Sequence, residues 1–188
     1  GTLGLFRGQT ARTLADLAEA QGAAGGLVSL DPNIRPQIID DRDAWQVFHD
    51  RWLAVAGIYK GSDEDLEWIF PGQSAEESAA MVLESGVDAV ILTKGSEGLV
   101  ILTRDGAVEA AAPSVEVVDT VGAGDTIVGT TLASLWMRGV RDRAALAAMT
   151  TDEWLPISER AVVAAGITCS RAGANPPTAA ELDAAMAP

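Results

Sequence analysis

Helical patterns alternate with short apolar runs along the first half of the chain, and this alternation constrains the fold more than any other feature. The apolar runs cover residues 27–30, 58–60 and 87–93, and the helical patterns before them cover residues 12–21, 42–57 and 75–84. Short strands that are apolar on both faces and separated by helices are typical of a parallel sheet covered on both sides. The chain is therefore predicted to be an α/β protein with a doubly wound, mostly parallel sheet and helices on both faces.

The second half of the chain begins with a predicted β-hairpin. Residues 98–103 and 107–112 flank Arg104-Asp105-Gly106, in which Asp-Gly readily supplies the positive φ of a tight turn. Helical patterns follow over residues 122–138, 141–148 and 158–170 and from residue 179 onward. Leu132, Leu135, Trp136 and Cys169 are predicted to be core positions of these helices.

The balance of charge and the few cysteines and histidines exclude several classes of function. The chain has 27 acidic and 13 basic residues, a net charge of −14 over 188 residues. Such a surface repels nucleic-acid phosphates and anionic lipid headgroups, so neither is an expected partner. One cysteine cannot form an intramolecular disulfide, and one histidine, His49, excludes zinc motifs built on paired histidines. His49 is expected to be a partly buried structural residue, and the composition predicts a cytoplasmic protein of one domain.

Three segments are expected to line a ligand crevice. Ligands of open parallel sheets bind beyond the carboxyl ends of the strands. The segments in question cover residues 31–36, 93–98 and 119–125. The first contains two prolines, Pro32 and Pro36, which prevent a regular helix or strand there.

The segment over residues 119–125, Asp-Thr-Val-Gly-Ala-Gly-Asp, carries the strongest chemical signal and runs directly into a predicted helix. Small residues let the backbone approach a ligand closely, and unpaired N–H groups at a helix start form an anion site that suits phosphate. A carboxylate beside a bound phosphate, such as Asp125, makes chemical sense as a base for a neighbouring hydroxyl that attacks the phosphoryl group. A plain glycine-rich turn with an aspartate in the first helical turn is the structural alternative.

This segment resembles the C-terminal signature, Asp-Thr-x-Gly-Ala-Gly-Asp, of the PfkB-type carbohydrate kinases, which have the ribokinase fold. The resemblance implies that Asp125 is the catalytic base for a sugar hydroxyl and that the amides of Gly122, Ala123, Gly124 and Asp125 form an anion hole. It also implies ATP and Mg²⁺ as cofactors and a sugar as substrate. No P-loop, dinucleotide fingerprint or hydrolase elbow occurs in the sequence.

Two further segments are similar to parts of the same family. Residues 31–36 resemble the Asp-x-Asn-x-Arg segment of fructokinases and 2-keto-3-deoxygluconate kinases, which implies that Asp31 and Arg35 face substrate or phosphate and that Asn33 lies by the nucleotide. Residues 93–98 resemble a strand-end loop that contacts ATP. The nucleotide-binding residues implied there are Thr93, Lys94, Gly95 and Gly98. An Asx turn and an ordinary turn before a hairpin are the structural alternatives.

The resemblance also implies two cation sites. Ser62 and Asp65 occupy the place of an Asn-x-x-Glu motif that organises magnesium through water, so Asp65 is a candidate for Mg²⁺; an N-cap of the next helix is the alternative. Residues 170–174 are similar to a closing segment that, together with Asp119, holds a monovalent cation such as K⁺ in some family members.

The resemblance covers only the C-terminal part of the usual family chain and lacks its N-terminal part and lid. Residues 1–188 are therefore expected to be the C-terminal part of a single kinase domain. A homodimer of the complete protein is a further expectation. Two functions remain open: a fructokinase-like kinase, with 2-keto-3-deoxygluconate as the alternative substrate, and a truncated non-catalytic domain that binds a nucleotide or a partner.

Overall fold

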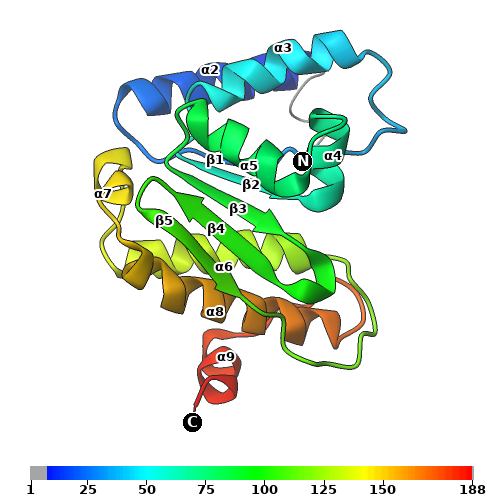
Figure 1. Cartoon of the computed structure of the whole chain (residues 1–188), viewed down its shortest axis with the longest axis vertical. Coiled ribbons are helices and arrows are strands. Elements are labelled where there is room, and N and C mark those ends of the chain that lie inside the picture. Colours follow the sequence, from blue (N-terminus) through cyan, green and yellow to red (C-terminus); the bar gives the residue numbers. More distant parts are fainter. Residues whose placement is uncertain (1–7, 188) are drawn as a thin grey trace. The chain divides into compact units, whose positions relative to one another are not determined.

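Helices and strands alternate along the computed structural model, which describes residues 8–187 (Figure 1). The predicted α/β class is confirmed. The described residues divide into two units by their contacts. The first unit contains residues 8–92, 102–104 and 141–148, and the second contains residues 93–101, 105–140 and 149–187.

The first unit contains most of the helix and strand alternation that the sequence predicts. Its elements are α2 (Gly8–Ala23), β1 (Ser29–Leu30), α3 (Arg42–Leu53), β2 (Ile58–Ser62), α4 (Asp63–Ile69), α5 (Ala75–Glu84), β3 (Ala89–Thr93, the last residue of which counts with the second unit) and α7 (Arg143–Ala147). β1 and β2 pair in parallel, with Ser29 opposite Ile58 and Leu30 opposite Tyr59. β2 and β3 bury four successive residues each, as strands covered on both faces do.

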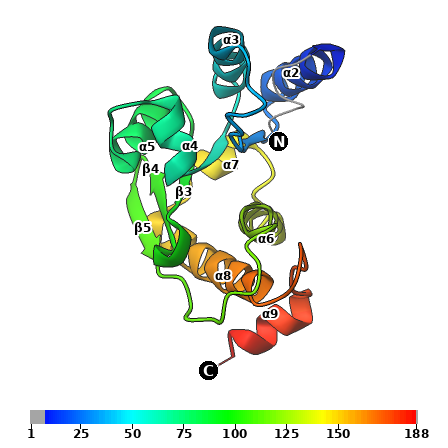
Figure 2. The same ribbon diagram turned by 90° about the vertical axis from the view of Figure 1, so that its right-hand side faces the viewer.

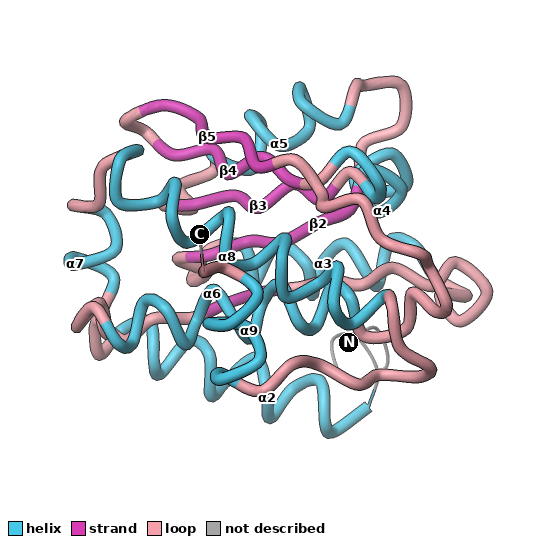
Figure 3. Tube along the Cα trace, turned by 90° about the horizontal axis from the view of Figure 1, so that it is seen from below, coloured by secondary structure: helices cyan, strands magenta, loops and turns pink. Residues whose placement is uncertain are grey.

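The second unit is built on the predicted hairpin and on two long helices. Its elements are the short 3₁₀ helix η1 (Gly95–Glu97), β4 (Leu99–Thr103, whose last two residues count with the first unit), β5 (Gly106–Ala110), α6 (Ala123–Met137), α8 (Thr151–Cys169) and α9 (Ala179–Ala185). Hydrogen-bonded neighbours in the five-stranded sheet follow the chain order β1-β2-β3-β4-β5. A long loop without regular structure joins β5 to α6 (Figure 3).

The core of the second unit forms where α8 packs on β5 and on α6, and the two helices lie side by side (Figure 2). α8 buries Trp154, Ile157 and Ala161, and α6 buries Ile127 and Leu135. Because these apolar side chains leave water together, they fix the N-terminal end of α6 on a rigid base.

Three sequence-based predictions about these helices need correction. α8 begins at Thr151 rather than at residue 158, because Thr150 and Glu153 form a capping box, and Pro156 lies inside the helix. Trp136 is 60% exposed and does not belong to the buried residues of α6. Cys169 is only half-buried at the last position of α8. Among residues 8–187, no helix combines the length and the apolar character that crossing a bilayer requires.

Candidate functional site

The turn over residues 119–125 leads into α6 with backbone amides directed past the helix start. Gly122 is the N-cap and adopts a left-handed conformation, with φ of 83°. The amide of Ala123 donates to the carbonyl of Thr120 at 3.2 Å. The amide of Ala123, which was predicted to face the anion, is therefore already bonded, whereas within residues 8–187 the amides of Gly122, Gly124 and Asp125 have no acceptor. Three donors at the positive end of a 15-residue helix remain for an anion.

Asp119 fastens this turn to the end of α8. One carboxylate oxygen accepts the amide of Val121 at 3.0 Å, and the other accepts the amide of Gly173 at 2.9 Å. These amides, that of Val121 first, hold the pKa of Asp119 below its usual value of 3.8. The amide of Asp119 itself donates to the carbonyl of Cys169 at 3.1 Å. Asp119 thus joins the turn to the segment after α8 as a carboxylate that accepts one backbone amide from each.

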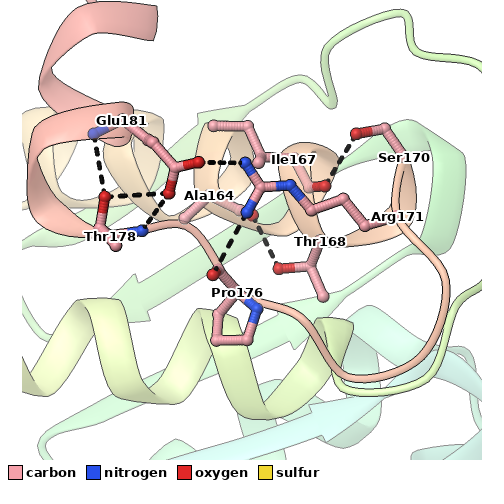
Figure 4. Close-up of polar contacts among 8 residues, drawn as sticks. All are labelled: Ala164, Ile167, Thr168, Ser170, Arg171, Pro176, Thr178 and Glu181. Atoms are coloured by element: carbon pink, nitrogen blue, oxygen red, sulfur yellow. Dashed lines mark hydrogen bonds and ion pairs between the residues drawn. The ribbon is translucent and has the colours of Figure 1, made fainter.

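The underside of the turn packs tightly against the residues that follow α8. A Cβ atom on Gly122 would lie 2.9 Å from the Cβ atom of Ala174. The hydroxyl groups of Thr126 and Thr168 are 3.0 Å apart, and that of Thr168 also donates to the carbonyl of Ala164, as Figure 4 shows for Ala164 and Thr168. Glycine at position 122 is therefore required twice, by its positive φ and by the close approach of Ala174.

Asp125 lies in the first turn of α6, next to these free amides, and is exposed. A carboxylate at this position is stabilised by the helix dipole while remaining accessible to a ligand. The turn therefore places backbone donors that can bind an anion next to an accessible carboxylate that can accept a proton.

Residues 93–98 form a tight connection in the same unit. Thr93 ends β3, and the amide of Lys94 donates to the carbonyl of Gly98 at 2.8 Å. Gly95 and Gly98 have φ of 54° and 108°, and a side chain at position 98 would collide with the carbonyl of Ala110. The ammonium of Lys94 lies 4.0 Å from Glu97. The two glycines thus shape the loop, and Lys94 is its only cationic side chain.

The loop over residues 31–36 belongs to the first unit and is held by buried charged groups. Asn33 is the only described non-glycine residue with a positive φ, at 45°. The amide of Ile34 donates to Asp65 at 2.7 Å, and Arg35 reaches back to the carbonyl of Ile34 at 2.7 Å. The ammonium of Lys60 lies 3.3 Å from Asp31. The strained backbone at Asn33 is therefore fixed on both sides.

Asp31 keeps one buried carboxylate oxygen without a hydrogen-bond donor within the described part of the chain. Burial raises the pKa of Asp31 above its usual 3.8, and the attraction of Lys60 opposes this rise only in part. A group of this kind binds a proton or a hydrogen-bond donor readily.

Asp65 does not fit the predicted role in a magnesium site. The residue is 6% exposed, and its two oxygens accept the amides of Ile34 and Ser62, at 2.7 Å and 3.0 Å. Ser62 is the N-cap of α4, as the alternative interpretation expects. No cluster of three histidine, cysteine or acidic side chains suited to a metal occurs between residues 8 and 187. Asp65 is thus a buried acceptor that ties the loop over residues 31–36 to the start of α4.

The predicted site residues therefore fall into two groups. Gly122, Ala123, Gly124, Asp125 and Asp119 lie with residues 93–98 in the second unit, and Asp31, Asn33, Arg35 and Asp65 lie in the first. Sequence reasoning missed Lys60, which pairs with Asp31. A charged residue inside the apolar run over residues 58–60 was the available signal for Lys60, because a buried lysine requires an anionic partner.

Residues 4–180 match the pfkB family of carbohydrate kinases. The chain belongs to this family. A fructokinase from Rhizobium leguminosarum bv. trifolii is 39% identical over 142 residues, which are 76% of this chain and 42% of that protein. The family assignment made from the motif over residues 119–125 is therefore confirmed. The chain spans about two fifths of the length of this curated relative.

Solved structures of kinases share the fold. The crystal structure of aminoimidazole riboside kinase from Salmonella enterica, complexed with aminoimidazole riboside and an ATP analog, is 26% identical, with a TM-score of 0.85 over 99% of this chain and 61% of that one. A fructokinase from Vibrio cholerae O395, solved in a form with bound fructose, ADP and calcium ion, is 24% identical, with a TM-score of 0.84 over 99% of this chain and 59% of that one. The predicted ribokinase-like fold is confirmed.

Proposed function

We propose that residues 1–188 are the C-terminal, nucleotide-side part of a single kinase domain, and that the complete protein transfers a phosphoryl group from ATP to a sugar hydroxyl. The observation that carries this proposal is the turn over residues 119–125, in which exposed Asp125 lies beside backbone amides without acceptors, those of Gly122, Gly124 and Asp125 itself. Family membership and the ATP analog in the aminoimidazole riboside kinase structure support ATP as the donor.

In the proposed reaction, Asp125 accepts the proton of the sugar hydroxyl as the hydroxyl oxygen attacks the γ-phosphorus of ATP. The bond from that phosphorus to the oxygen of the leaving ADP breaks, and the proton remains on the carboxyl group of Asp125. The amides of Gly124 and Asp125 stabilise the negative charge of the transferring group, because they are fixed before the reaction. Asp125 must be free to receive the proton, and its exposure in the absence of substrate allows this.

The other predicted residues would bind and orient the nucleotide. Lys94 supplies a positive charge, and Thr93, Gly95 and Gly98 shape the loop that carries it. In the loop over residues 31–36, Asn33 would lie by the nucleotide, and Asp31 and Arg35 would face substrate or phosphate. Magnesium, when bound with ATP, would neutralise phosphate charge. Asp119, with both oxygens on backbone amides, stays a candidate for the edge of a monovalent cation site.

Fructose is the substrate that the relatives favour, because the Rhizobium relative is a fructokinase. Aminoimidazole riboside is the second candidate, favoured by the TM-score and identity of the Salmonella kinase that binds it. 2-Keto-3-deoxygluconate, a cytoplasmic location and a homodimer of the complete protein stay predictions of the sequence.

Replacing Asp125 by Asn in the complete protein tests the mechanism. We expect kcat for ATP-dependent phosphorylation of fructose to fall by about 100-fold to 10,000-fold, with the affinity for Mg-ATP almost unchanged, because only the base is removed. Asp152→Asn is the matched control, since Asp152 is an exposed aspartate in the first turn of α8 in the same unit. Turnover of Asp125→Asn near that of this control would exclude Asp125 as the base.

A calorimetric titration of the 188-residue chain with Mg-ATP tests whether this part of the protein binds a nucleotide. Binding that is retained in Asp125→Asn supports a nucleotide site in this part of the protein. Absence of binding at millimolar Mg-ATP would contradict the nucleotide-side assignment.

A further inference from the structure

We propose that Arg171 is a positioning residue: its side chain closes the segment between α8 and α9 and thereby holds the turn over residues 119–125 in its anion-binding shape. The proposal rests on the proposed function, because it gives that turn a role in binding nucleotide. It concerns two groups of residues, here called the anion-binding turn (residues 119–125) and the closing segment (residues 170–178).

The closing segment touches the anion-binding turn at two consecutive residues. The amide of Gly173 donates to Asp119 at 2.9 Å, and Ala174 packs under Gly122. Gly173 has φ of 68°, so the segment bends sharply at this contact. Among the described residues, the hydrogen bond from Gly173 to Asp119 is the only one that the backbone amides of residues 172–177 donate. The backbone of the closing segment therefore depends on other groups for its shape.

Arg171, the second residue of the closing segment, restricts the shape of this backbone. Its guanidinium donates to Glu181 at 2.7 Å and to the carbonyl of Pro176 at 3.4 Å, so one side chain reaches both the segment and the helix beyond it (Figure 4). A planar guanidinium can make both contacts at once, because its N–H groups point in fixed, separate directions. The contacts of Arg171 with Pro176 and Glu181 thus close the stretch of chain that contains Gly173 and Ala174, the two residues that contact the anion-binding turn.

Glu181 is itself held in place for this contact. The oxygen that does not contact Arg171 accepts the amide of Thr178 at 2.7 Å and its hydroxyl group at 2.9 Å (Figure 4). The amide of Thr178, followed by Arg171, lowers the pKa of Glu181 from 4.5 to about 2. Glu181 therefore stays charged near neutral pH, and Arg171 keeps a fixed acceptor at the start of α9.

A second ion pair joins the same two helices without touching the closing segment. Arg160 on α8 contacts Asp183 on α9 at 2.6 Å. The side chains of Arg160 and Arg171 are both 27% exposed. Each arginine forms an ion pair with an acidic residue of α9; Arg160 lies on α8, and Arg171 lies two residues beyond its end. The pair of Arg160 and Asp183 is consequently a matched control: it contributes to the docking of α9 but not to the shape of the closing segment.

The experiment compares Arg171→Gln with Arg160→Gln in the 188-residue chain by amide hydrogen exchange. We expect the amides of Gly173 and Val121, which both donate to Asp119, to exchange about fivefold faster in Arg171→Gln and at the wild-type rate in Arg160→Gln. Arg171→Lys should give an intermediate rate, because a lysine ammonium keeps the charge but lacks the fixed, planar fork of the guanidinium. Equal acceleration in the two glutamine variants, or none in Arg171→Gln, would overturn the proposal.

The affinity for Mg-ATP links the proposal to function. Arg171→Gln should bind Mg-ATP several-fold more weakly than Arg160→Gln, although both variants lose similar thermal stability. Hydrogen exchange is measured without nucleotide, so it decides the role of Arg171 even if the chain binds no Mg-ATP, a result that would count against the proposed function alone. Equal Mg-ATP affinity in the two variants, together with faster exchange only in Arg171→Gln, would overturn the claim that the contacts of Arg171 serve nucleotide binding.

Discussion

The loop over residues 31–36 and the anion-binding turn carry the predicted site residues, and they are fixed in opposite ways. The loop is held by buried charged side chains, Lys60 and Asp65, which are 6% exposed each. The turn is held by backbone amides, small residues and one partly exposed carboxylate, that of Asp119. The same contrast extends to the two units. In residues 8–187, the buried ionisable side chains are His49, Tyr59, Lys60, Asp65 and Asp88, all in the first unit, whereas the buried polar residues of the second unit carry hydroxyl groups.

This difference indicates which kinds of substitution should destabilise each region. A buried charge is costly when its partner is lost, so the first unit should respond strongly to substitution of single polar residues and to pH. A turn built from backbone and small residues should respond instead to added side-chain volume. Because the carboxylate of Asp125 is exposed, this turn keeps its charge without the free-energy cost of burying it.

Asp65→Ala should have the largest effect on stability. It leaves the amides of Ile34 and Ser62 without an acceptor, and we expect a loss of about 4 kcal/mol in the free energy of unfolding. Urea unfolding followed by tryptophan fluorescence measures this loss. Glu77→Ala is the control, because Glu77 forms the same capping box at the exposed start of α5 but makes no bond to another loop. A loss in Asp65→Ala no greater than in the control would show that Asp65 only caps α4.

The next largest effect is a dependence of stability on pH that comes from His49. Burial lowers the pKa of His49 from 6.5 to about 4, and Asp50 opposes this only in part. The unfolded chain then binds more protons than the folded chain at pH 5, so stability falls as the pH drops below 6.5. We expect a loss of about 2 kcal/mol between pH 7 and pH 5.

His49→Gln provides the comparison, since glutamine can still bond to the hydroxyl of Tyr59 but does not titrate. This variant should lack most of the loss between pH 7 and pH 5 in urea unfolding curves. Asp31 acts with the opposite sign: its raised pKa makes the folded chain bind the extra proton, so its contribution to stability falls as the pH rises above 3.8. An unchanged pH dependence in His49→Gln would assign the effect to other groups.

The smallest effect is expected at the anion-binding turn. Gly122→Ala and Gly139→Ala place an alanine at φ of 83° and 82°, just before and shortly after α6, and each should lose about 1 kcal/mol of stability. Only the side chain at position 122 meets Ala174, since nothing lies within 4 Å of a Cβ atom at position 139. Gly122→Ala should therefore lose more stability and also bind Mg-ATP more weakly in a calorimetric titration. Equal Mg-ATP affinity in the two variants would separate the turn from nucleotide binding.

Most elements of the fold could be predicted because their signals are local. Ser74 and Glu77 mark the start of α5, whose bounds match the prediction, and Asp-Gly marks the hairpin turn between β4 and β5. The start of α8 was predicted wrongly, since a proline usually marks the end or the start of a helix, whereas Pro156 lies inside α8, after the capping box of Thr150 and Glu153. Trp136 was assigned to the core from its helical spacing, which does not specify which face of α6 packs on a neighbour.

The sequence alone determined the family, the glycine-containing turn over residues 119–125 and the place of Asp125 in the first turn of a helix, because these depend on neighbouring residues and backbone conformation. Only the tertiary structure decided that Asp65 bonds to the amide of Ile34, that Lys60 pairs with Asp31 and that Arg171 reaches Pro176 and Glu181. The physical reason is that buried charges and exposed side chains take their partners from the packing of distant segments, and the pattern of a sequence carries no record of those partners.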